Sequence, residues 1–161
     1  METIIHSTTG WIHFITASIA MISGTAILLL PKGTKQHKIV GYWYVVSMVV
    51  MLVTSFMIYG LFGGFGVFHV ASIVSTLTLI AGMIPVWRRK PGSNWVSYHF
   101  SFMYWSVLGL YAAFFSEVLT RVPATPFFGM VGIASFLTFG IGGYVFSKKK
   151  KQWFAIFASK A

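Results

Sequence analysis

Five long apolar runs dominate this chain and leave little sequence between them. They cover residues 11–30, 39–60, 65–87, 95–119 and 127–146. A helix needs about 20 mainly apolar residues to cross the hydrocarbon core of a bilayer. With 57% hydrophobic residues and only two acidic residues in 161, the chain is too apolar for a soluble globular domain. The runs therefore predict an all-α integral membrane bundle of five transmembrane helices.

The connections between the runs are short, so we expect residues 1–161 to form a single transmembrane domain. Residues 1–10 hold no Lys or Arg ahead of the first run, which is not the pattern of a cleavable signal peptide, and the first span is expected to be retained. The chain has no cysteine, which excludes disulfides, thiolate metal sites and Cys-attached haem.

The basic residues are distributed unevenly over the connections. Every Lys and Arg except Arg121 falls between the first two runs, after the third or after the fifth, which an alternating topology places on one side of the membrane. Because Lys and Arg concentrate in cytoplasmic loops, we expect the N-terminus outside and the C-terminus in the cytoplasm. This placement accounts for the net charge of +10 as a topology signal and an attraction to anionic lipid, so no nucleic-acid partner is expected.

Four histidines fall near the starts of four different runs, one for each run. They are His13, His37, His69 and His99. The predicted topology puts His13 and His69 near the outer surface and the other two near the cytoplasmic surface. An ionisable group inside the hydrocarbon region costs on the order of 3 kcal/mol, so it normally has a partner or a function. The four imidazoles are therefore the main functional candidates.

One interpretation is a metal site at the outer face. Glu117 lies eighteen residues, or five helical turns, after His99 and so ends the fourth run at the outer level. His13, His69 and Glu117 would then form a two-His, one-carboxylate site for Zn, Fe or Mn. His6, just before the first run, could fold back onto this site.

A second interpretation is that His13 pairs with His69 and His37 with His99, each pair binding one haem b. Small residues one turn after two of these histidines, Ala17 and Gly41, would leave room for the ring. Haems at two depths would carry electrons across the membrane. Glu117 has no role here. Both interpretations predict a membrane protein that binds a transition metal or haem, for electron transfer or for metal-dependent chemistry at the outer face.

Other functions remain open from the residues alone. The histidines could be structural, with Glu117 simply pairing with Arg121 one turn on. The chain would then be a non-enzymatic subunit or assembly factor of a larger membrane complex, or a homo-oligomer, with the glycine-rich fifth run as the docking surface. A small-solute or proton-coupled transporter is a further alternative, because buried His and Glu can relay protons. Neither an inverted repeat nor a pair of Pro-broken spans supports it.

Residues 32–41, KGTKQHKIVG, followed by an aromatic-rich span, resemble a signature of a bacterial membrane family known as domain of unknown function 2306. Its members look like this chain in a His in the first span, a K-G-T-x-x-H-x-x-x-G turn, and a His before the third and fourth spans. The resemblance covers residues 11–123. It implies a protein of the bacterial cytoplasmic (inner) membrane and supports treating the four histidines as a set, but it implies no activity.

Overall fold

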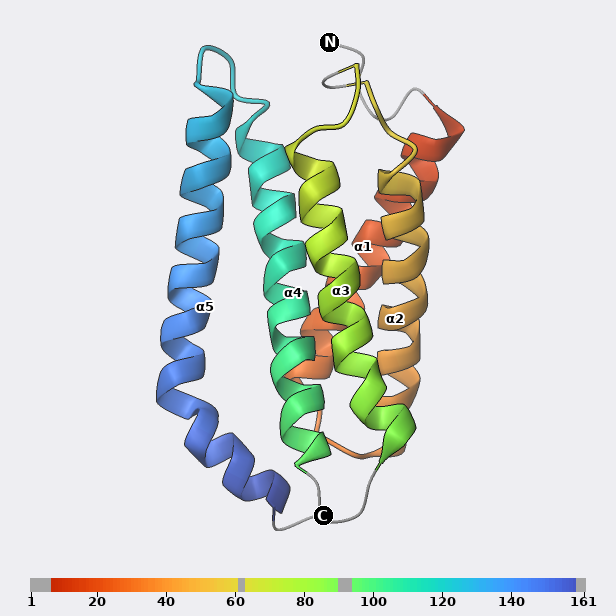
Figure 1. Cartoon of the computed structure of the whole chain (residues 1–161), viewed down its shortest axis with the longest axis vertical. Coiled ribbons are helices and arrows are strands. Elements are labelled where there is room, and N and C mark those ends of the chain that lie inside the picture. The colour runs from red at the N-terminus through yellow and green to blue at the C-terminus, as the bar shows by residue number, and fades with distance from the viewer. Residues whose placement is uncertain (1–6, 61–62, 90–93, 159–161) are drawn as a thin grey trace. The chain divides into compact units, whose positions relative to one another are not determined.

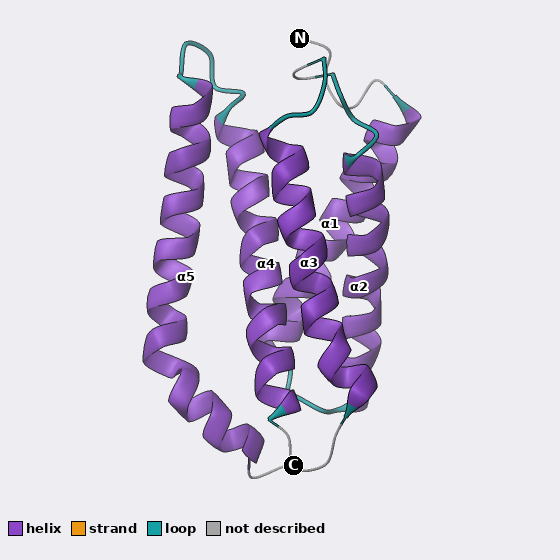
Figure 2. Ribbon diagram, in the orientation of Figure 1, coloured by secondary structure: helices purple, strands orange, loops and turns teal. Residues whose placement is uncertain are grey.

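The computed structural model is all-helical over the residues that it describes, 7–60, 63–89 and 94–158 (Figure 1, Figure 2). Its five helices are α1 (Thr8–Leu29), α2 (Lys35–Ser55), α3 (Val67–Arg88), α4 (Trp95–Leu119) and α5 (Phe127–Ala158). All five are long and apolar enough to cross a membrane. The predicted fold class is therefore confirmed. The side of the membrane on which each end lies stays a prediction.

The helix starts are set by hydroxyl N-caps that the apolar runs did not reveal. Ser7 Oγ accepts a hydrogen bond from Gly10 N–H at 3.0 Å, so α1 begins at Thr8. Thr34 Oγ1 accepts from His37 N–H at 3.1 Å, and α2 begins at Lys35 rather than at residue 39. A capping hydroxyl satisfies backbone donors that have no partner within the helix. Helices α1 and α2 therefore both start earlier than the apolar runs that predicted them.

The basic connection after α1 also ends that helix. Lys32 Nζ donates three hydrogen bonds of 2.7–2.9 Å to main-chain carbonyls of the last turn, those of Ile27, Leu28 and Leu30. Burial lowers the pKa of the Lys32 ammonium, and these carbonyls replace the water that it loses. A cation at a helix C-terminus also interacts favourably with the helix dipole.

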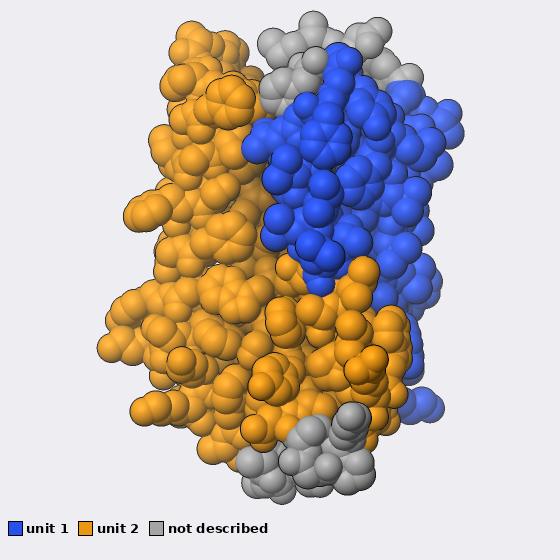
Figure 3. Space-filling view, viewed as in Figure 1, with its two compact units in different colours: residues 1–77 blue, residues 78–161 orange. Residues whose placement is uncertain are grey.

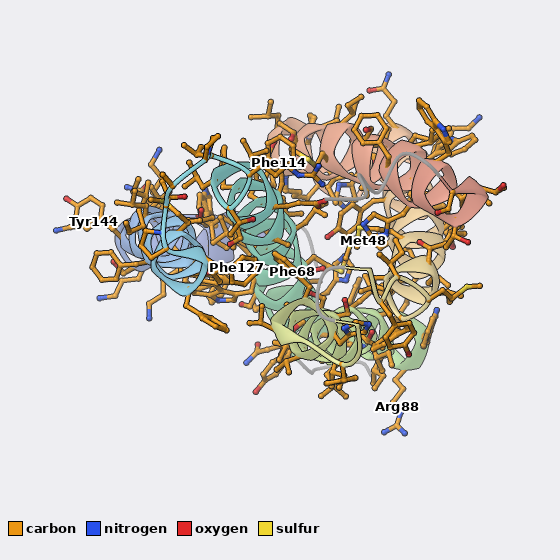
Figure 4. The ribbon with its side chains drawn as sticks, turned by 90° about the horizontal axis from the view of Figure 1, so that it is seen from above. Met48, Phe68, Arg88, Phe114, Phe127 and Tyr144 are labelled. Atoms are coloured by element: carbon orange, nitrogen blue, oxygen red, sulfur yellow. The ribbon has the colours of Figure 1, made fainter. Side chains whose placement is uncertain are left out.

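The chain divides into two compact units, residues 1–77 and residues 78–161 (Figure 3). In the first unit α1 packs along α2, and in the second α4 packs along α5. The boundary falls inside α3, so whether the chain behaves as a single domain stays a prediction. Met48 on α2 is fully buried, and Figure 4 shows Tyr144 directed away from α4.

The fifth helix continues through the C-terminal basic segment. Its final stretch turns toward α4 (Figure 1). Trp153 lies 5.2 Å from Phe100 and 5.8 Å from Tyr104 between ring centroids. Trp153 therefore packs against α4, while the side chains of residues 156–158 are outside the described part.

Candidate functional site

His13 lies on the buried stripe of α1 and is bonded to α2. Its Nδ1 is 3.2 Å from Met51 O and 3.1 Å from Thr54 Oγ1. A carbonyl oxygen can only accept, and the Thr54 hydroxyl donates to carbonyls of its own helix, so Nδ1 carries the ring proton. In the neutral imidazole Nε2 then carries the lone pair. This is the tautomer in which a histidine coordinates a metal through Nε2, with Nδ1–H held by a backbone carbonyl.

His69 has the opposite hydrogen-bonding arrangement. It is the third residue of α3, and its Nδ1 accepts a hydrogen bond from Gly66 N–H at 3.1 Å, just ahead of the helix. This is the second half of a capping box, in which the N3 side chain reaches back to the N-cap amide. Because Nδ1 accepts, Nε2 of the neutral ring is a donor. The His69 residue is 4% exposed, and its Nε2 is buried without a hydrogen-bond partner.

Aromatic side chains surround the His69 ring. Tyr59 and Phe65 stack against it, with centroid separations of 4.8 and 4.9 Å and interplanar angles of 25° and 27°. Phe56 lies 6.3 Å away in a tilted orientation. None of these rings provides the Nε2 of His69 with a hydrogen-bond partner.

The last turn of α2 connects both histidine-bearing segments of the first unit. Thr54 is bonded to His13, and the adjacent Ser55 places its Oγ 2.7 Å from the Oγ of Ser72, one turn after His69. Thr54 and Ser72 are both buried. The structure therefore brings His13 and His69 to the same end of this unit, the end predicted to face outward.

His99, in the second unit, repeats the arrangement of His13. Its Nδ1 is 2.7 Å from Gly82 O on α3. The carbonyl again requires that Nδ1 donate, so Nε2 carries the lone pair. A methyl group at position 82 would lie 2.7 Å from Met103 Sδ, so a larger residue here would require the Met103 side chain to shift.

His37 stands at the third position of α2, four residues ahead of Gly41. Positions 37, 41, 44 and 48 follow helical spacing, and Tyr44 and Met48 on this stripe are fully buried. A Cβ added at Gly41 would nevertheless meet no atom within 4 Å. Whether this position leaves room for a haem ring stays a prediction.

Glu117 forms an ion pair with Arg121, just beyond the end of α4. Its Oε1 lies 2.6 Å from Arg121 Nη2, with side chains 35% and 45% exposed, respectively. Within the described ranges, no group of three or more His, Cys, Asp or Glu residues is arranged to hold a metal ion. The structure thus gives no support to the outer site of His13, His69 and Glu117, and His6 lies outside the described residues.

Sequence reasoning missed the partners that orient the histidines. These are Met51 and Thr54 for His13, Gly66 for His69, and Gly82 for His99. Every residue has a main-chain carbonyl, so the sequence does not indicate which carbonyl will be the partner of a histidine. The Thr54-Ser55 pair within an apolar run was the one available signal, because hydroxyls commonly bond across membrane helices.

Five apolar helices with imidazoles hydrogen-bonded between them define a multi-pass integral membrane protein. The family model described as predicted membrane protein (DUF2306) matches residues 10–148, and the chain belongs to this family. The family named from the turn motif is thereby confirmed. No curated protein and no solved structure matches the chain.

Proposed function

We propose that this membrane protein binds haem b, that His13 and His99 would each hold one of two separate haems, and that the bound haems would serve electron transfer. The observation that carries the proposal is the shared bonding of the two imidazoles. Each donates Nδ1–H to a main-chain carbonyl of a neighbouring helix, at 3.2 Å from Met51 O and 2.7 Å from Gly82 O. Such a bond fixes the tautomer and orientation in which Nε2 can coordinate iron.

The ligand count favours haem over a bare metal ion. A Zn or non-haem Fe site needs three or four protein ligands, whereas a porphyrin supplies four nitrogens and needs one or two imidazoles from the protein. No group of three or more candidate ligands occurs in the described ranges, and Glu117 is bonded to Arg121. The absence of cysteine fits a haem held only by coordination and packing.

The second axial ligands stay a prediction. The sequence assigns His69 to the haem of His13 and His37 to the haem of His99. We do not propose His69 as a ligand, because its Nδ1 accepts from Gly66 N–H and its Nε2 therefore offers no lone pair. Bound haem would supply one-electron redox chemistry, and the residues of this chain would orient it and exclude water from it.

We further propose a bacterial cytoplasmic membrane location with the start of α1 outside. The basic connections support this orientation, since Lys32, Lys35 and Lys38 follow α1 and Lys148–Lys151 lie in the last part of α5.

Haem titration of the purified protein tests the proposal. Hemin added to detergent-solubilised protein should produce a Soret band that saturates at about two equivalents per chain, because one haem is expected on each carbonyl-bonded histidine. The His13→Ala variant should saturate at about one equivalent. His6→Ala serves as the matched control and should titrate like the wild type. A linear rise without saturation, equal in all three proteins, would contradict the proposal.

A further inference from the structure

We infer that His69 is the hydrogen-bond donor of a binding site for a membrane quinone at the end of α2 and the start of α3. The Nε2 of His69 is buried and unpartnered, in a residue that is 4% exposed. The site is distinct from the two haem positions proposed above, which rest on His13 and His99.

The hydrogen bond at the other ring nitrogen decides what His69 can bind. Gly66 N–H donates to Nδ1 at 3.1 Å, so Nε2 of the neutral ring presents an N–H and not a lone pair. A metal ion needs a lone pair, whereas an N–H needs an oxygen or nitrogen acceptor. A buried donor without an acceptor is costly, and native proteins rarely leave one unpaired. The missing partner is therefore an acceptor atom.

The charge of the surroundings indicates a neutral acceptor. Residues 39–87 contain no Lys, Arg, Asp or Glu, and the lysines of this unit follow α1 at the opposite end of α2. Among the described residues of this unit, a carboxylate or phosphate would find no countercharge at this end of α2, and its desolvation would be unfavourable. A carbonyl oxygen meets the requirement without a charge.

The aromatic rings indicate a flat ligand that arrives from the bilayer. Tyr59 and Phe65, which stack against His69, are 47% and 61% exposed. Rings this exposed can turn aside at small packing cost and can stack on a planar ring. A quinone combines a planar ring, carbonyl acceptors and solubility in lipid. The hydroxyls of Ser55, at the end of α2, and Ser72, one turn after His69 in α3, are bonded to each other and add polar groups near His69.

The test is equilibrium binding of two tritium-labelled probes, a short-chain benzoquinone and a short-chain naphthoquinone, to the full-length protein in nanodiscs, with empty nanodiscs as background. Wild-type protein should bind at least one probe saturably. His69→Asn should weaken that binding about tenfold or more, because the shorter amide can still accept from Gly66 N–H but has no donor at the Nε2 position. His69→Gln, which places an amide N–H near that position, should recover part of the loss.

Tyr144→Phe is the matched control, since Tyr144 is an exposed residue of the second unit and the change removes only a hydroxyl; it should bind like the wild type. Circular dichroism and gel filtration show whether each variant is folded. If His69→Asn is not folded, His69→Phe takes its place, and quinone affinity should then decrease in the order wild type, His69→Gln, His69→Phe. Saturable binding of neither probe by the wild type, or equal binding by wild type and the His69 variants, would overturn the inference. Haem content measured in the same samples is independent, because His69→Asn leaves His13 and His99 in place.

Discussion

The variant His99→Ala is expected to lose one of the two haems of this protein. The Nε2 of His99 carries the lone pair, and its Nδ1–H is held by Gly82 O at 2.7 Å, which fixes the orientation of the ring. Changes to the groups that orient a ligand already cost about 10–100-fold in affinity, so removal of the ligand itself should cost more than about 100-fold. Hemin titration and pyridine haemochrome analysis measure the loss.

Added imidazole separates ligation from a structural role. If the alanine variant only lacks a ligand, millimolar imidazole should restore the Soret band. A variant that has lost its packing should not respond. Haem content equal to that of the wild type in folded His99→Ala would refute His99 as a ligand.

The substitution Gly142→Leu should be the most damaging single change in the second unit. A side chain at position 142 would run into Leu108, whose Cγ lies 3.1 Å from the first added carbon, and the carbonyl of the same residue accepts a 2.8 Å hydrogen bond from Tyr104 Oη. Small residues allow membrane helices to approach this closely. Overpacking typically costs about 1–3 kcal/mol, and we expect about 3 kcal/mol or more here because the Tyr104 bond is strained as well. Unfolding in denaturing detergent, followed by circular dichroism, measures the loss.

Gly140→Leu provides the matched control two residues away. A Cβ at Gly140 meets no atom within 4 Å, so its unfolding should match that of the wild type. The same variant tests the docking-surface alternative. If Gly140→Leu loses a partner protein while its stability is unchanged, that partner is bound at this face of α5. Equal destabilisation by the two leucines would contradict the account of α4 packing on α5.

The helices could be predicted from the sequence because the bilayer imposes their length and their apolar character. The predicted fourth span, residues 95–119, coincides with α4, whereas the start of α2 was missed by four residues. The difference arises because Thr34 caps a first turn that contains the polar residues Lys35, Gln36 and His37. Hydropathy detects the membrane span, but the N-cap residue determines where the helix begins.

The candidate site was only partly predictable. Spacing along the chain selected His13 and His69 as residues of one membrane level, and the bonds from Thr54 and Ser55 bring them to one end of their unit. The protonation pattern could not be predicted, since it depends on Gly66 N–H in one case and on the carbonyl of Met51 in the other. Residue types therefore suggested a symmetric pair of ligands. In the structure, however, Nδ1 of His69 accepts a hydrogen bond, whereas Nδ1 of His13 donates one.

The central claim, that this protein carries haem on its histidines, is tested most directly by one absorption measurement. The protein is purified in mild detergent from haem-sufficient cells, and spectra are recorded as isolated and after dithionite. The account predicts a Soret band that shifts on reduction and a sharpened alpha band typical of b-type haem. A folded, colourless protein that also takes up no hemin when it is added would contradict it.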